Sequence, residues 1–429
     1  MKVKTKLVIV LFCALFCFAF FPCARSTAEA EDGAAFSVYS GGEKIASFID
    51  VVPFAENHIV YEQMRERRVN APPRVKRGFL RELALTHTAK DAVLTCYPGV
   101  KEVFAEASRR AYVPPRDSRI DFHPDRVPHF DLRREKDGAE IDEEAFYREA
   151  ATALIGGSRK IEVRLKPVPA RVKTEDNRKY LYLKSYFSTD LSSSTSARRH
   201  NVALALESLN GEVIESGETL SFNATVGERS EKRGYKGAKI IVDGNYVDGV
   251  GGGVCQASTT LYNAALIAGL RADARPHSLK PSYVMPSFDA MVNSSWSDLV
   301  ITNVTSGPVF IKAQANANAA KVWIYGEKNA YEIRRRSSFR EVGELPADEI
   351  VADEEGKYSG SDVEGGVRIA SGERAGVSEG WLDYYSSGSL VKSIRIRSDK
   401  YKAKRGKIAV RTKKVENAPE SGNFSFSPS

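Results

Sequence analysis

A run of three glycines precedes a cysteine in the stretch "DGVGGGVCQASTTLYNAAL", which spans residues 248–266. Glycine adopts backbone conformations that other residues avoid, so Gly251, Gly252 and Gly253 permit a sharp turn. The residues after Cys255 have a helical pattern, and that helix would begin close to the cysteine. Unpaired N–H groups and the dipole at a helix N-terminus favour a thiolate. The stretch therefore predicts a reactive thiol at Cys255, with a small buried core side chain as the alternative.

The glycine turn also offers backbone donors beside the thiol. When a thiolate attacks a carbonyl group, the oxyanion that forms is stabilised by N–H groups aimed at it. The candidate donors are the amides of Gly251, Gly252, Gly253 and Val254. One short segment would then supply both the nucleophile and the oxyanion hole.

A cysteine nucleophile usually works with a base, and two histidines lie in the same region of the chain. His277, in "RPHSLKPSY", follows the cysteine's helix and can fold back towards the loop. His200 lies on the predicted helix "RRHNVALA". Asp289, in "SFDAMV", would hold the imidazole tautomer as a triad carboxylate does. We therefore predict a catalytic set of Cys255, His277, His200 and Asp289, while a structural or surface position is the alternative for each histidine.

The first 30 residues have the layout of a secretory signal. Basic "MKVKTK" is followed by the apolar run "LVIVLFCALFCFAFF" and then by Ala28-Glu29-Ala30, an A-x-A-like cleavage site. The apolar run is shorter than the roughly 20 residues that a membrane-spanning helix needs. We expect an exported protein that is extracellular or associated with the cell wall. An uncleaved segment that anchors the chain in the membrane is the alternative.

The net charge of +8 predicts an anionic environment. Nucleic acid, a membrane surface and an acidic wall polymer all fit that charge, but export argues against nucleic acid. Membrane contact is expected only if the N-terminal segment stays uncleaved. The tail stretch "SIRIRSDKYKAKRGKIAVRTKK" alternates apolar and basic residues. One face of that strand would contact anionic wall polymers or simply be solvated.

Cysteine usage and ligand spacing limit the remaining chemistry. Three cysteines lie in the signal-like segment, which leaves Cys96 and Cys255 in the mature chain. A disulfide between them is possible in an exported protein, although they lie in segments that look like different domains. The run "DAVLTCYPG" predicts a strand around Cys96. No C-x-x-C or H-E-x-x-H spacing occurs, so we expect neither a metal nor a cofactor.

Helix-like and strand-like patterns mix along the whole chain, which predicts an α+β protein of several domains. We expect a mixed α/β domain around Cys255 and a small β-rich tail behind it. The expected divisions are a signal peptide (1–30), an N-terminal extension (31–75), an α+β domain (76–180), the cysteine-bearing domain (181–326) and a basic β-rich tail with a disordered end (327–429).

The cysteine-bearing region resembles the VanW family, exported domains of mostly Gram-positive bacteria. The matching pieces are Asn201, "LNG", "GETLSFNATVG", "GY", "GGGVCQASTTLYNAAL", "HS", "SY" and the "FDA" around Asp289. At residues 287–291 family members tend to have Gly-Leu-Asp-Ala-Thr, where this chain has Ser-Phe-Asp-Ala-Met. The segment 76–180 resembles, more loosely, the peptidoglycan-binding domain that often precedes this family's domain. The tail is similar, more weakly still, to a small glycine-rich wall-binding module.

The resemblance implies that some VanW domains are L,D-transpeptidases with the loop cysteine as nucleophile. Our leading hypothesis is therefore a wall enzyme that cross-links peptidoglycan stem peptides through Cys255. A non-catalytic peptidoglycan-binding or scaffold protein, tied to wall remodelling or glycopeptide resistance, is the second hypothesis. A cysteine peptidase acting on stem peptides is the third. The sequence pattern does not separate the first from the third, because acceptor choice depends on pocket shape.

Overall fold

The computed structural model describes residues 35–49, 73–158, 160–242, 245–362 and 364–411. It divides into two compact units. The first consists of the described residues up to 116 together with 136–170, and the second of 117–135 together with the described residues from 171 onwards. Both units mix helices and strands, which confirms the α+β prediction. The predicted signal peptide and the predicted disordered end lie outside the described residues.

The first unit packs helices against a small sheet with strand order β2-β1-β6, in which β1 pairs antiparallel with β2 and parallel with β6. A second pair, β5 with β7, is antiparallel. The core of the first unit includes Leu80, Val93, Phe146 and Leu154. The elements are β1 (Ala35–Ser40), β2 (Glu43–Ile49), α2 (Pro73–Leu83), α3 (Ala89–Cys96), α4 (Val100–Ala111), β5 (Gly138–Ile141), α5 (Glu143–Ile155), β6 (Lys160–Glu162) and β7 (Leu165–Val168).

The strand predicted around Cys96 is wrong, because these residues form helix α3. Thr88 caps the helix by accepting a hydrogen bond from the Asp91 amide at 3.1 Å. The buried residues Ala92, Val93 and Cys96 follow the spacing of one helix face. A short apolar run cannot distinguish a buried strand from a buried helix, and here the cap decides between them.

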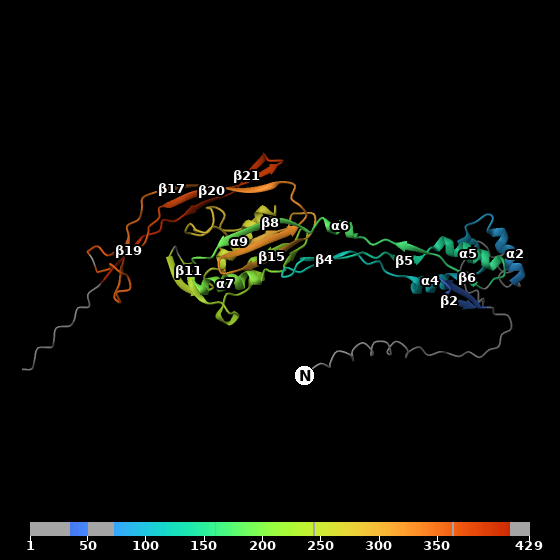
Figure 1. Ribbon diagram of the computed structural model, residues 1–429. Coiled ribbons are helices and arrows are strands. Elements are labelled where there is room, and N and C mark those ends of the chain that lie inside the picture. Colours follow the sequence, from blue (N-terminus) through green and yellow to red (C-terminus); the bar gives the residue numbers. More distant parts are fainter. Residues whose placement is uncertain (1–34, 50–72, 159, 243–244, 363, 412–429) are drawn as a thin grey trace, which may run out of the picture. The chain divides into compact units, whose positions relative to one another are not determined.

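The second unit is built on a four-stranded antiparallel sheet of order β8-β16-β15-β9. The sheet consists of β8 (Tyr182–Asp190), β9 (Val213–Ile214), β15 (Val309–Ala315) and β16 (Ala319–Gly326). Helix α9 (Val254–Ile267) runs alongside β8 and also contacts β16, while α7 (Ser196–Glu207) contacts β15 and α9 (Figure 1). Helix α9 is buried almost all round, so it forms the centre of this core.

Smaller elements surround that sheet. The antiparallel pair β11 with β12 leads directly into the glycine turn. The segment "ETLSFNATVG" has a strand-like pattern, but it forms a strand only as far as Ser221, whose hydroxyl caps the short helix that follows. The remaining elements up to residue 302 are β3 (Arg119–Phe122), β4 (Phe130–Arg133), α6 (Thr174–Arg178), β10 (Thr219–Ser221), α8 (Phe222–Val226), a 3₁₀ turn (Glu231–Arg233), β11 (Gly237–Val242), β12 (Asn245–Val250), β13 (Arg271–Asp273) and β14 (Val300–Thr302).

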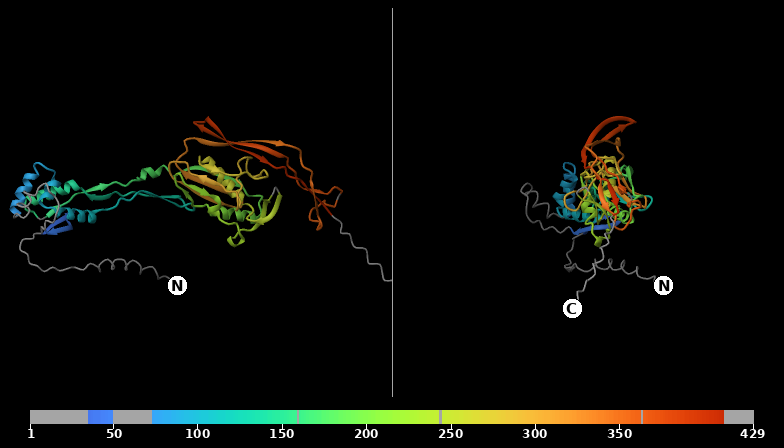
Figure 2. Two further views of the ribbon diagram at one scale, coloured as in Figure 1. Left: turned by 180° about the vertical axis from the view of Figure 1, so that it is seen from behind. Right: turned by 90° about the vertical axis from the view of Figure 1, so that its left-hand side faces the viewer.

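After β16 the described chain consists of strands, as the sequence predicts for the tail. The long strands β17, β20 and β21, drawn in orange and red, form an antiparallel sheet of order β17-β20-β21 (Figure 2). A second sheet has the order β18-β22-β19. The bounds are β17 (Glu332–Val342), β18 (Glu349–Ala352), β19 (Val367–Ala370), β20 (Ala375–Ser386), β21 (Ser389–Tyr401) and β22 (Lys407–Val410). Among the described residues, no helix combines the length and apolar character needed to cross a membrane.

Candidate active site

Cys255 is the second residue of α9, directly behind the glycine turn. Gly251 and Gly253 have φ values of +85° and +109°, which L side chains rarely adopt. The thiol is partly exposed, and its Sγ lies 3.3 Å from the carbonyl oxygen of Val292, to which the thiol form can donate. The sequence thus locates Cys255 correctly at the start of a helix, and the turn holds it at the surface of the core.

The turn is held tightly from two sides. A Cβ atom on Gly252 would come within 2.7 Å of the backbone of Ala238 and Lys239, so a side chain has no room there. Buried Asn201 donates to the carbonyl oxygens of Gly252 at 3.0 Å and Lys236 at 2.8 Å, and accepts from the Lys236 amide at 2.8 Å. These contacts fix the backbone that precedes the nucleophile.

Two of the four predicted oxyanion donors are already used inside the loop. The Gly251 amide donates to the Lys236 carbonyl at 3.1 Å, and the Val254 amide donates to the Gly251 carbonyl at 3.2 Å. Within the described part of the chain, the amides of Gly252, Gly253 and Cys255 donate to no other backbone group. Of these, Gly253 and Cys255 are the better candidates for an oxyanion hole, because they are nearest to the thiol in the chain.

The structure brings His277 and Asp289 together next to the thiol. Oδ2 of Asp289 accepts from the His277 backbone amide at 2.6 Å and lies 2.8 Å from Nδ1 of its ring. Both residues are buried, His277 with 6% of its surface exposed and Asp289 with none. With Nδ1 directed at Asp289, Nε2 is the ring nitrogen left to interact with Cys255. The geometry is that of a nucleophile–base–carboxylate chain.

The pKa values of these three groups shift in the directions that such a chain requires. Burial raises the pKa of the Cys255 thiol, but the hydrogen bond and charge of His277 outweigh it and lower that pKa overall. Burial lowers the pKa of His277, yet Asp289 and Cys255 raise it to about 9. Burial also opposes the charge on Asp289, whose pKa nevertheless falls because His277 and Arg397 stabilise the carboxylate. Together these shifts favour the thiolate–imidazolium form.

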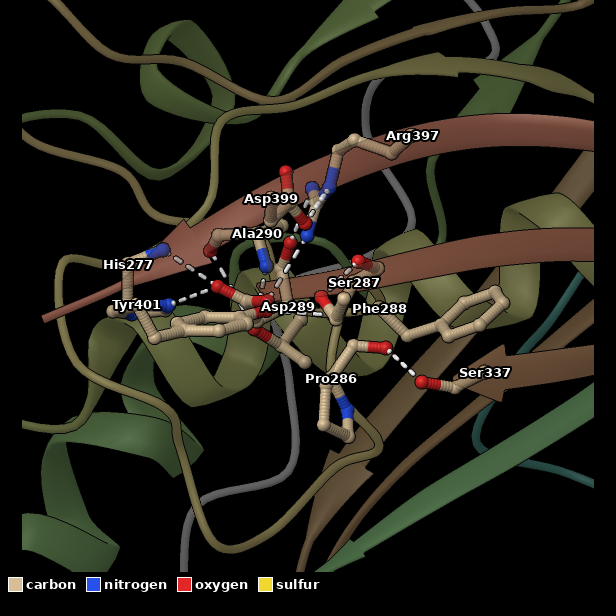
Figure 3. A network of polar contacts seen from close by, with 12 residues as sticks. His277, Pro286, Ser287, Phe288, Asp289, Ala290, Ser337, Arg397, Asp399 and Tyr401 are labelled. Carbon is tan, nitrogen blue, oxygen red and sulfur yellow. Dashed lines mark hydrogen bonds and ion pairs between the residues drawn. The ribbon is translucent and has the colours of Figure 1, made fainter. Parts of the chain in front are cut away.

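The second oxygen of Asp289 is held by strand β21 (Figure 3). Its Oδ1 accepts from Nη2 of Arg397 at 2.9 Å and from the Tyr401 hydroxyl at 2.7 Å. Nη1 of Arg397 also donates to the Asp289 carbonyl oxygen at 2.7 Å, and its Nε donates to Asp399 at 2.6 Å. The expected basic face of this strand is thus interrupted, because Arg397 is buried against the site.

Ser287, two residues before Asp289, has a φ of +64°. This is the position at which VanW relatives tend to carry glycine, which adopts such a φ without strain. Here the conformation is held by neighbours: the Ser287 amide donates to the Tyr401 hydroxyl at 2.8 Å, and its Oγ lies 2.5 Å from that of Ser378. Ser287 therefore adopts this left-handed conformation without being a glycine.

His200 lies apart from this chain of contacts. It is exposed on α7, and its Nε2 lies 2.9 Å from the carbonyl oxygen of Gly234. Among the described residues, none of its hydrogen bonds involves Cys255, His277 or Asp289. The contact fits the structural alternative for His200, whereas the catalytic roles of the other three stay predictions.

Four further residues near the site are missing from the sequence-based set. Burial and the charge of Cys255 raise the pKa of Tyr283, while its hydrogen bond with Thr259 opposes that shift. Arg229 packs its Cβ against Gly251, and burial lowers its pKa. Tyr283 belongs to the "SY" piece of the family pattern, which could have indicated it as a site residue. Arg229 belongs to no such piece, and Arg397 and Tyr401 lie in the tail.

Among the described residues, no group of three or more His, Cys, Asp or Glu side chains could hold a metal ion. Cys96 and Cys255 form no disulfide in the described part of the chain. The thiol of Cys255 is therefore available for the chemistry that its neighbours favour.

Comparisons with known proteins match the part of the chain that contains this site. A family model described as VanW-like protein matches residues 197–325. The chain is 38% identical to uncharacterized protein YoaR of Bacillus subtilis (strain 168) over 138 residues, which are 32% of this chain and 46% of the relative. It is 31% identical to vancomycin B-type resistance protein VanW of Enterococcus faecalis (strain ATCC 700802 / V583) over 111 residues, 24% of this chain and 40% of the relative.

A solved structure, HP0197-G5, aligns with 19% of this chain and 99% of its own at 7% identity, but the TM-score of 0.10 assigns no fold. The matches to the two curated relatives span less than half of either relative's length. The family model and the relative from Enterococcus faecalis both carry the VanW name. Residues 197–325, which contain Cys255, His277 and Asp289, are therefore a VanW-like domain.

Proposed function

We propose that the protein is a cell-wall enzyme, an L,D-transpeptidase that uses Cys255 to cross-link peptidoglycan stem peptides. The contact chain from Cys255 through His277 to Asp289 carries this proposal, because it favours a thiolate beside its own proton donor. Similarity to a vancomycin resistance protein supports a role connected with the cell wall. Export through residues 1–30 is part of the proposal, as is attachment to the wall by segments outside 197–325.

In the first half of the reaction, the Cys255 thiolate attacks the carbonyl carbon of the third residue of a stem tetrapeptide. The amides of Gly253 and Cys255 would hold the oxyanion that forms. The C–N bond to the terminal D-alanine then breaks, and the departing amine takes the proton of the His277 imidazolium. A thioester on Cys255, a neutral His277 and free D-alanine result.

In the second half, an amine on a neighbouring stem peptide attacks the thioester carbonyl. His277 takes a proton from that amine as the new amide bond forms and the C–S bond breaks. Cys255 leaves as the thiolate, and the thiolate–imidazolium pair is restored. Water in place of the amine would give hydrolysis, the reaction of a peptidase.

Arg229 suits the recognition of a substrate carboxylate. It is partly buried beside the glycine turn, and its guanidinium donates to the side-chain oxygen of Asn223 and lies 5.8 Å from the Phe222 ring. No ion pair involves Arg229 among the described residues. A cation of this kind near the nucleophile favours an anionic ligand, and stem peptides carry carboxylates.

The proposal is tested by incubating the purified protein with disaccharide-tetrapeptides and identifying the products by mass spectrometry. Cross-linked dimers with release of D-alanine support a transpeptidase. Disaccharide-tripeptide without dimers identifies a peptidase instead. Binding to purified sacculi with no covalent product favours the scaffold alternative. A matched Cys255→Ala protein shows whether any product depends on the thiol.

A further inference from the structure

The Asp289 carboxylate is shared between two distant parts of the chain. Its Oδ2 faces His277, whereas its Oδ1 receives Arg397 and Tyr401 of strand β21 (Figure 3). Residues 197–325, which the VanW-like family model covers, include neither of these two donors. The domain that carries the nucleophile therefore does not by itself supply all the partners of its buried carboxylate.

The polar groups that hold Asp289 are themselves buried. The Arg397 side chain is only 12% exposed, and its guanidinium donates to both the carboxylate and the carbonyl of Asp289 and to Asp399. An ionised carboxylate with no exposed surface requires such compensation, because burial without a partner strongly disfavours the charge. A planar guanidinium with several fixed donors also restricts the rotation of the group that it holds.

We propose that Arg397 and Tyr401 are positioning residues of the active site, so that the C-terminal strand β21 is part of the catalytic centre. They fix the orientation and charge of Asp289, which in turn orients His277 towards Cys255. This inference rests on the proposed function, since it concerns the same site. It assigns the tail a role beyond attachment to the wall.

The titratable and charged neighbours of Asp289 define what its loss of support would do. They are His277, Arg397, Asp399, Tyr401, Tyr262 and Tyr283, with Cys255 beyond His277. Without Arg397, Asp289 and Asp399 would be two nearby buried carboxylates with no cation between them. Burial already raises the pKa of Asp399, so Asp399 would take a proton. Asp289 would lose the guanidinium that fixes its orientation and would hold the His277 imidazolium less firmly, and the Cys255 thiolate would lose stabilisation.

The test measures the rate at which iodoacetamide alkylates Cys255 as a function of pH, read on the Cys255 peptide by mass spectrometry. In the plot of alkylation rate against pH, the rate rises as the thiolate forms, and we call this rise the thiolate limb. In Arg397→Gln we expect the thiolate limb to move to higher pH by about one unit, so that alkylation near pH 6 falls about tenfold. The control is Arg395→Gln on the same strand. Arg395 is 59% exposed and pairs with Glu379, so the profile should match that of the wild type.

Two further variants keep the inference falsifiable if Arg397→Gln does not fold. Tyr401→Phe removes one donor to Oδ1 without changing charge, and should shift the limb in the same direction by a smaller amount. Arg397→Lys keeps the cation but loses the fork, and should restore part of the wild-type profile. A folded Arg397→Gln or Tyr401→Phe protein with a wild-type alkylation profile would overturn the inference.

The same experiment separates this inference from the proposed function. If wild-type Cys255 is alkylated at low pH and the variants do not change this pH dependence, only the positioning role is contradicted. If wild-type Cys255 is alkylated only in the pH range of an ordinary cysteine and no cross-linked product forms, the proposed function is contradicted. Circular dichroism of each variant shows that the comparison is made between folded proteins.

Discussion

Nη2 of Arg397 lies 2.9 Å from Oδ1 of Asp289, although 108 positions separate the two residues in the chain. The opposite oxygen of the same carboxylate lies 2.8 Å from Nδ1 of His277. Asp289 therefore links a cation on the C-terminal strand to the imidazole beside the nucleophile. A substitution at Arg397, Asp289 or His277 should therefore change the reactivity of the Cys255 thiol.

Replacing Asp289 by asparagine should impair both stability and activity. The variant keeps the size of the side chain but removes one of the two carboxylates paired with buried Arg397 and, among the described residues, the only one paired with His277, and breaking a buried ion pair typically costs about 3 kcal/mol or more. Urea denaturation should show this loss, and cross-linking should fall by at least about 100-fold because His277 loses its orienting carboxylate. Asp383→Asn is the control: Asp383 is a buried carboxylate paired with half-exposed Arg336, and its loss should lower stability without changing the reactivity of Cys255.

The thiol at Cys255 should be indispensable for covalent chemistry. Cys255→Ala removes the nucleophile and should abolish cross-linking, while sacculus binding stays as in the wild type. Cys96→Ala alters a residue buried in α3 of the other unit, so product formation should change little. Product formation by Cys255→Ala would mean that the chemistry lies elsewhere.

The pH dependence of Cys255 should reflect its pairing with His277. Because the pKa of the thiol is lowered, wild-type alkylation should persist below the range of an ordinary cysteine, near pH 8.5. In His277→Ala only burial acts strongly on the thiol, so the limb should move to higher pH and cross-linking should fall about 10²–10⁴-fold. His200→Ala is the control and should keep the wild-type limb.

Activity should also have an alkaline limit. His277, with a pKa raised to about 9, gives up its proton above that pH and no longer protonates the leaving amine. Cross-linking should therefore decline through about pH 9, whereas alkylation, which needs only the thiolate, should not. The stability that His277 gains from its partners is complete below its unfolded pKa, near 6.5, and is lost as the pH rises through about 9. Parallel decline of both reactions above pH 9 would contradict this assignment.

Arg229 should affect substrate binding more than the chemical step. Arg229→Gln removes the cation beside the glycine turn, and we expect KM for disaccharide-tetrapeptide to rise about tenfold. The fall in kcat should be smaller, because the Arg229 charge is the last-ranked of the effects that lower the pKa of the Cys255 thiol. Lys232→Gln, in the exposed turn three residues later, controls for the general loss of a positive charge. Equal effects of the two substitutions would argue against a specific carboxylate contact.

A side chain should be rejected at Gly252 in the glycine turn but tolerated at Gly237, the first residue of β11. In Gly252→Ala the new Cβ would meet the Ala238 and Lys239 backbone at 2.7 Å, and forcing it in should cost about 1–3 kcal/mol and displace Cys255. Gly237→Ala meets nothing within 4 Å and should be neutral or slightly stabilising. Thermal unfolding and alkylation rate distinguish the two variants.

The part of the site that lies close together in the chain could be predicted from the sequence. The glycine turn, the start of α9, and the return of His277 and Asp289 all follow from local pattern and from a short connection behind one helix. The contacts of Arg397 and Tyr401 with Asp289 could not be predicted, because side-chain contacts between residues more than 100 positions apart leave no local signature in the sequence. Their basic, alternating strand predicts a solvated face or an ionic surface equally well.

The misassigned elements have a local cause. Around Cys96 a cap at Thr88 selects a helix for a run that is apolar enough for either structure. At Ser221 a capping hydroxyl ends a strand early and starts α8. In both places one hydrogen bond to a backbone amide outweighs the apolar pattern on which the prediction was based.

The position of β21 also sets an order in time. A chain is synthesised from its N-terminus, and its early segments begin to fold before the later ones exist. The nucleophile, the base and Asp289 are therefore made well before Arg397 and Tyr401. Until the last long strand joins the sheet, the carboxylate lacks its cation and the thiol lacks its full activation. A nascent chain would thus carry a less reactive cysteine than the finished protein.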